Sequence, residues 1–173
     1  MTQKVRFRGT VTLIPGASSG IGAALSRKIE RHGGDLFLAA RREERLQDLS
    51  ENIRGVGRRA LALKCDVTRN GDMEEAAAKV QEEFGRIDYV IANAAFGVIG
   101  KIEKLSLEAY RHQFETNVFG VRRTKQGHPR ASFCIVRMPR HHRKRQRIYR
   151  TARVLCLFHV QACLSRPCRR PPA

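Results

Sequence analysis

The chain has 173 residues, enough for one domain with a buried core and too few for two. Its formal net charge of +18 would ordinarily indicate a nucleic acid or an anionic membrane surface as partner. However, residues 1–121 carry 19 Lys and Arg against all 16 acids, whereas residues 122–173 carry 15 Lys and Arg and no acid. Most of the net charge therefore comes from the C-terminal segment, and it does not exclude an enzyme.

Up to residue 121 the chain alternates short apolar runs with longer amphipathic segments. The runs are rich in Val, Leu, Ile and Ala and are bounded by Gly, Pro or Asp, as buried strands are. The longer segments carry apolar residues three and four positions apart, which is typical of helices. In chain order, the pattern predicts strand 9–14, helix 20–33, strand 35–40, helix 42–55, strand 59–64, helix 70–85, strand 88–94 and helix 106–121.

Four strand–helix repeats in succession predict parallel strands joined by right-handed crossovers, with helices on both faces of the sheet. This is the doubly wound α/β, Rossmann-like architecture, here incomplete. We expect residues 1–124 to form this domain and residues 125–173 to be a basic, disordered tail. The apolar stripe of the first helix is Ile21, Leu25 and Ile29, and that of the last helix is Leu107, Tyr110, Phe114 and Val118.

A glycine-rich segment, "PGASSGIG" (15–22), lies between the first predicted strand and the first predicted helix. Gly16 permits a tight turn, Gly20 lets the backbone approach a pyrophosphate, and Gly22 lets helix and strand pack closely. The free amides at the helix start would then face the anion. At the first strand–helix junction, this segment predicts a dinucleotide site rather than a simple structural turn.

At this point the sequence resembles the short-chain dehydrogenase/reductase family, whose version of the turn is TGxxxGIG. Three further segments resemble family motifs in the same order: "CDVT" (65–68), "NAA" (93–95) and "ETNVFGV" (115–121). The resemblance implies an oxidoreductase that uses a nicotinamide cofactor on a small-molecule carbonyl or alcohol. It assigns cofactor binding to Gly16, Ser18, Ser19, Gly20, Ile21, Gly22, Arg41, Arg42, Asp66, Val67, Asn93 and Ala94.

Two positions depart from the family motifs. Pro15 replaces a Thr and removes a backbone donor and a hydroxyl at the strand end. Ala95 replaces a Gly and adds a methyl group where the backbone and the cofactor ribose come close. Together these changes predict weakened cofactor affinity.

The residues after the second predicted strand favour NADP over NAD. A carboxylate there would accept hydrogen bonds from the ribose hydroxyls of NAD, whereas an Arg accommodates the 2′-phosphate of NADP. This chain has Ala40 at the family's acidic position, followed by Arg41 and Arg42. Two cations are poorly placed at the start of a solvated helix, because the helix dipole disfavours them.

The family's catalytic set is a Ser, a Tyr with a Lys four residues later, and an Asn. Only the Asn has a match, at Asn117. The one downstream tyrosine, Tyr149, is followed four residues later by Arg153, and an Arg does not replace the Lys that lowers the pKa of the catalytic Tyr. We therefore expect the chain to be catalytically incompetent.

The tail has several interpretations. Its abundance of Arg, Cys, His and Pro, with no acid after Glu115, is typical of a GC-rich gene translated out of frame, after a truncated oxidoreductase. A nucleotide-binding fragment whose tail binds nucleic acid or an anionic surface is the alternative, although a solvated charge run is more usual. Its first candidate contacts are Arg140, Arg143, Lys144, Arg145 and Arg147.

The remaining features concern metals and location. The spacings of Cys156, His159, Cys163 and Cys168 match no usual zinc pattern, so no metal site is expected. No apolar run reaches the roughly 18 residues of a membrane span. The N-terminus lacks a signal-peptide pattern, and five cysteines, an odd number, suggest reduced thiols, so we expect a cytoplasmic protein.

Overall fold

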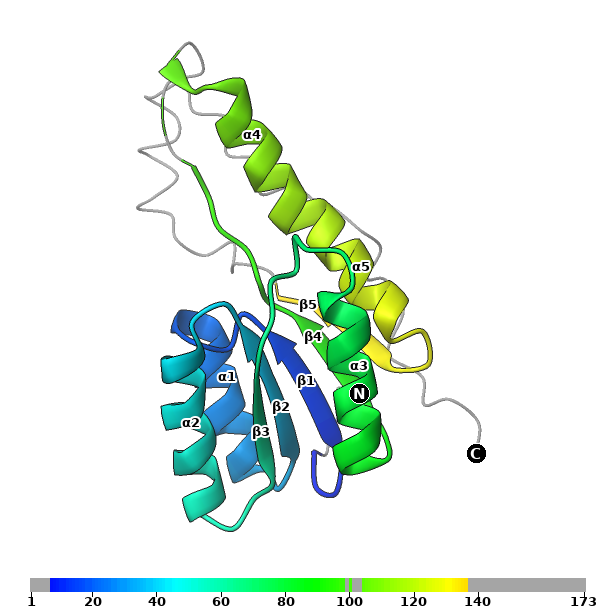
Figure 1. The fold of residues 1–173 in the computed structure, drawn as a ribbon. Coiled ribbons are helices and arrows are strands. Elements are labelled where there is room, and N and C mark those ends of the chain that lie inside the picture. Colours follow the sequence, from blue (N-terminus) through cyan, green and yellow to red (C-terminus); the bar gives the residue numbers. More distant parts are fainter. Residues whose placement is uncertain (1–6, 99, 101–103, 137–173) are drawn as a thin grey trace, which may run out of the picture.

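The computed structural model describes residues 7–98, 100 and 104–136, and these form a parallel five-stranded sheet with helices on both faces (Figure 1). The strand order is β3-β2-β1-β4-β5. Because the order reverses beside β1, this is the doubly wound, Rossmann-like arrangement, and the predicted fold class is confirmed. The strands are β1 (Val11–Pro15), β2 (Asp35–Ala40), β3 (Ala60–Lys64), β4 (Tyr89–Ala92) and β5 (Ser132–Ile135).

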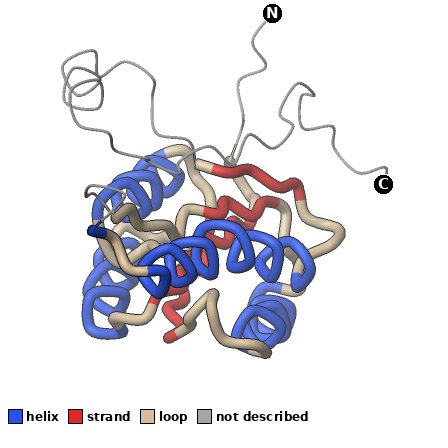
Figure 2. The backbone as a smooth tube through the Cα atoms, turned by 90° about the horizontal axis from the view of Figure 1, so that it is seen from above, coloured by secondary structure: helices blue, strands red, loops and turns tan. Residues whose placement is uncertain are grey.

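The helices cover the sheet in two groups, as the view from above in Figure 2 shows. One group packs on Ile14, Leu36 and Leu38, and the other packs on Leu13 and Phe37, because successive strand residues point to opposite faces. All of these side chains are fully buried. The helices are α1 (Gly20–Arg31), α2 (Glu43–Gly55), α3 (Asp72–Phe84), α4 (Leu107–Phe114) and α5 (Gly120–Gly127), with a π-helical segment η2 (Glu115–Phe119) between the last two.

Helices α4, η2 and α5 run on from one another and extend beyond the carboxyl ends of the strands (Figure 1). The apolar stripe predicted for this helix is only partly covered, because Leu107 is 59% and Phe114 40% exposed, whereas Tyr110 and Val118 are half-buried. Val118 lies in the π-helical segment, whose turn holds more residues than an α-helical turn, so its spacing from the other stripe residues differs from the predicted one.

Secondary structure continues past residue 124, the predicted end of the domain. Thr124 lies inside α5 and is buried, and its hydroxyl donates to the Gly120 carbonyl. The chain then returns through buried His128 to β5, which pairs with β4 along its whole length. Tyr149 and the basic run of the predicted tail lie outside the described residues.

Candidate cofactor site

The glycine turn leaves β1 at the carboxyl end of the sheet and enters α1 with two residues in the left-handed region, Gly16 at φ +76° and Gly20 at φ +56°. The N–H groups of Gly16 and Ala17 both donate to the carbonyl of Ala39, which fixes the turn to β2. A Cβ atom at Gly16 would lie 2.8 Å from the Cα atom of Ala94. The turn therefore needs glycine for both its conformation and its close contact with Ala94, in the loop after β4.

Gly22 is the second position at which a side chain would not fit. A Cβ atom there would lie 2.3 Å from the Gly16 carbonyl oxygen and 2.6 Å from Nδ2 of Asn93. That amide nitrogen donates to the Gly16 carbonyl at 3.0 Å. The glycines thus allow turn, helix and strand end to meet, as the sequence predicts for Gly22.

The N-terminus of α1 is arranged to receive an anion. Its N-cap residue, Ser19, makes no side-chain capping hydrogen bond, and the first turn contains no acid. The first backbone N–H groups and the positive end of the helix dipole are consequently not neutralised by the helix itself. A phosphate group is the usual partner of such a helix start.

A cavity of about 730 Å³ opens beside this helix start. Eleven of the twelve residues assigned to cofactor binding line it, and the exception, Gly22, is buried beneath the turn. Ile21, which belongs to the predicted apolar stripe of α1 and is also among the residues assigned to cofactor binding, is 48% exposed and lines this cavity. The complete lining is Gly16, Ser18, Ser19, Gly20, Ile21, Ala40, Arg41, Arg42, Cys65, Asp66, Val67, Asn93, Ala94, Ala95, Phe96, Gly97, Thr116 and Val136.

Two arginines form a cationic rim where β2 ends. The guanidinium of Arg42 donates to the Ser19 hydroxyl at 2.7 Å and to the Ser18 hydroxyl at 3.3 Å. Arg41, next to it, is exposed to the same cavity. Ala40 is buried and brings no carboxylate to this position. The rim is therefore positively charged and is held against the glycine turn.

Asp66, which follows β3, supplies a negative group in the cavity lining near the arginine rim. Burial raises its pKa, but the backbone N–H and hydroxyl of Thr68 hydrogen-bond to its carboxylate, and Arg41 and Arg69 lie near it. The net effect lowers the pKa of Asp66 below its ordinary value. The side chain is thus an ionised acceptor, which suits the amino group and hydroxyls of an adenosine.

Asn117 lies in η2 and is bound to the loop after β4. Its Oδ1 accepts from the Phe96 N–H at 3.1 Å, and its Nδ2 donates to the Phe96 carbonyl at 2.8 Å. One turn earlier on the same side, Oε1 of Gln113 accepts from the Val98 N–H. These amides hold the cavity wall at Phe96, while Thr116, beside Asn117, faces the cavity. The other catalytic candidate, Tyr149, lies outside the described residues.

Sequence reasoning missed several cavity residues. Phe96 and Gly97 follow the recognised "NAA" segment, and Thr116 lies within "ETNVFGV" beside Asn117, so proximity to a recognised motif was the available signal. Cys65 also lines the cavity, but burial, with Asp72 and Asp66 nearby, raises the pKa of its thiol to about 12. It therefore remains a neutral thiol rather than a nucleophile.

The described part of the chain offers neither a metal cluster nor a membrane-spanning helix. No three His, Cys, Asp or Glu side chains gather there in a way that could hold a metal ion. No described helix combines the length and apolarity needed to cross a membrane.

The chain belongs to the short chain dehydrogenase family, whose sequence model matches residues 10–130. Among curated relatives, the A-factor type gamma-butyrolactone 1'-reductase (1S-forming) of Streptomyces virginiae is 39% identical over 113 residues, which are 64% of this chain and 44% of the relative. The uncharacterized oxidoreductase YxnA of Bacillus subtilis (strain 168) is 33% identical over 115 residues, which are 66% of this chain and 32% of that protein.

Similar solved structures support this family assignment. The alcohol dehydrogenase of the archaeon Thermococcus sibiricus, complexed with 5-hydroxy-NADP, is 37% identical with a TM-score of 0.66, and the match covers 68% of this chain and 51% of that one. A short chain dehydrogenase/reductase from Burkholderia phymatum, in complex with NAD, is 28% identical with a TM-score of 0.68, covering 72% and 44%. This chain therefore spans about a third to a half of its relatives' length.

Proposed function

We propose that this chain binds NADP(H), in preference to NAD(H), in the cavity above the glycine turn. The glycine cradle and the uncapped start of α1 suit a pyrophosphate, and Asp66 suits an adenosine. These residues fit a dinucleotide, which when bound would supply the hydride chemistry of this family. The chain's own residues bind and orient the cofactor.

The observation that carries the choice of NADP is the position of Arg42. Its guanidinium is held by Ser18 and Ser19, so it lies on the turn itself and needs little ordering to meet a 2′-phosphate. The buried methyl group of Ala40 puts no negative charge there to repel that phosphate. Among related structures, one holds 5-hydroxy-NADP and another NAD, so the family alone does not choose.

Thermal unfolding with added cofactor tests this proposal. NADP should raise the melting temperature more than NAD at equal concentration, because a ligand that binds only the folded state stabilises it by mass action. Arg42→Ala should lower NADP affinity about tenfold or more, the effect of losing a charge-assisted hydrogen bond, and leave NAD affinity nearly unchanged.

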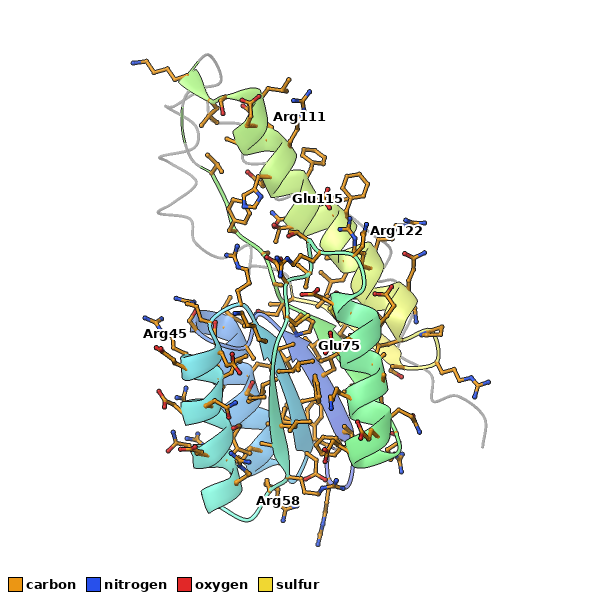
Figure 3. The ribbon with its side chains drawn as sticks, viewed as in Figure 1. Arg45, Arg58, Glu75, Arg111, Glu115 and Arg122 are labelled. Atoms are coloured by element: carbon orange, nitrogen blue, oxygen red, sulfur yellow. The ribbon has the colours of Figure 1, made fainter. Side chains whose placement is uncertain are left out.

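The matched control is Arg45→Ala, which removes the same charge three residues further on. Arg45 does not line the cavity and projects outward from α2 (Figure 3). It should leave both affinities unaltered. Equal stabilisation of wild type by NADP and NAD would contradict the proposal.

We propose further that this chain does not itself oxidise alcohols or reduce carbonyls. Asn117 is its one match to the catalytic set, and both polar atoms of that side chain are bound to Phe96. Without a proton donor, loss of general acid–base catalysis costs about a hundredfold to ten-thousandfold in rate. The test is turnover on a panel of small carbonyls and alcohols with NADPH and NADP. Robust turnover that Tyr149→Phe abolishes would show that this tyrosine is a working donor.

A further inference from the structure

The hydrogen-bonded ladder between β1 and β4 is shorter than the ladders on either side. β1 pairs with β2 as far as Pro15 and Ala39, and β4 pairs with β5 along its whole length. Between β1 and β4, however, the pairs are only Thr12 with Tyr89 and Leu13 with Val90. The ladder therefore stops short of the carboxyl ends of both strands, directly below the glycine turn.

Pro15 explains where it stops. In a parallel strand, alternate residues direct their N–H and C=O groups to opposite neighbours. The Gly16 N–H donates toward β2, so residue 15 faces β4. Continuing the observed register sets the N–H of residue 15 against the carbonyl of Ile91. Proline has no N–H, so that bond cannot form.

A side chain connects turn and strand instead. Asn93 directly follows β4, and its Nδ2 donates to the Gly16 carbonyl. Among the described hydrogen bonds, this is the one that joins the turn to the β4 side; the backbone bonds of Gly16 and Ala17 go to Ala39 on β2. The position of the turn over β4 thus depends on one amide group.

We propose that Pro15 and Asn93 are a coupled pair that positions the glycine turn for a dinucleotide pyrophosphate. Because Pro15 removes the backbone bond to β4, Asn93 sets the height and angle of the turn beside Ala94. The ligand in this inference rests on the proposed NADP function. The coupling between the two residues does not.

A double-mutant cycle in the full 173-residue chain tests the coupling. Pro15→Val restores the N–H with a β-branched residue that suits a strand and has the same number of side-chain carbon atoms as proline. Asn93→Ala should lower the melting temperature more in the wild-type background than in the Pro15→Val background, by about 4 °C. Equal decreases in both backgrounds would overturn the inference. If Asn93→Ala does not fold, Asn93→Ser, whose short hydroxyl does not reach Gly16, takes its place in the cycle.

Binding of NADP and of 2′-AMP separates positioning from general destabilisation. NADP contains the pyrophosphate that the turn would hold, whereas 2′-AMP needs only the Arg42 and Asp66 side of the cavity. Asn93→Ala should weaken NADP binding about tenfold in the wild-type background and less in the Pro15→Val background, with 2′-AMP binding unchanged. An equal loss for 2′-AMP would overturn the positioning role. If wild type binds neither ligand, the proposed function fails, and the melting cycle alone decides whether the pair is coupled.

Discussion

Replacing Gly22 with alanine tests whether the turn, helix and strand end meet as closely as the structure requires. The added Cβ atom would lie 2.3 Å from the Gly16 carbonyl oxygen, 2.6 Å from Asn93 Nδ2 and 3.0 Å from the Cα atom of Ala17. Two of these contacts are with backbone atoms, which cannot rotate away as a flexible side chain would. The substitution must therefore push the turn away from α1.

The cost has two parts. Overpacking a tight contact typically costs about 1–3 kcal/mol. Displacing Gly16 also breaks its hydrogen bond from Asn93, and such a bond contributes about 1 kcal/mol net. A total of about 2–4 kcal/mol corresponds to a fall of about 8–16 °C in melting temperature for a domain of this size. NADP binding should be lost as well, because the pyrophosphate cradle is displaced.

Gly55→Ala is the matched control, since it adds the same methyl group at the end of α2 where no atom lies within 4 Å of the new Cβ. It should leave the melting temperature unchanged or raise it slightly, because alanine reduces the conformational freedom of the unfolded chain. The assay is thermal unfolding by circular dichroism, with and without NADP. If Gly22→Ala melts within about 1 °C of wild type, the close packing described here is wrong, because even 1 kcal/mol would shift the transition further.

Three other predictions follow from separate features. Burial lowers the pKa of His128 below its ordinary 6.5, and nearby Lys125 adds to this effect, whereas the Thr124 carbonyl and Glu74 oppose it. As the pH falls, this histidine therefore binds a proton in the unfolded chain at a higher pH than in the folded chain. The free energy of unfolding should therefore decrease as the pH falls through the ordinary histidine pKa, and an equal pH dependence in His128→Gln would contradict the assignment. Ala95→Gly should strengthen NADP binding measured by calorimetry, because it removes a methyl group exposed to the cavity; unchanged affinity would mean that the ribose does not reach this residue. If residues 125–173 are translated out of frame, another reading frame of the coding DNA, downstream of about codon 124, should encode a strand ending in Ser and then a Tyr with a Lys four residues later. The absence of Tyr-x-x-x-Lys from both alternative frames would reject that interpretation.

The sequence by itself determined the local features of this protein. Strand and helix periods predicted the doubly wound sheet, and the observed bounds of β2 match the predicted ones. The glycine turn was recognisable because its conformation depends on residues that lie close together in the chain, Gly16 to Gly22. Neighbouring residues are enough to specify a turn, a strand period or a helix stripe.

Only the tertiary structure decided which distant groups meet. The Asn93 bond to Gly16 joins residues 77 apart, and the Asn117 bonds to Phe96 join residues 21 apart. Whether Phe114 is buried depends on what packs beside α4, and the consequence of Pro15 depends on which strand lies opposite its missing N–H. These outcomes are set by the register and packing of separate elements, and no local pattern in one element encodes the position of another.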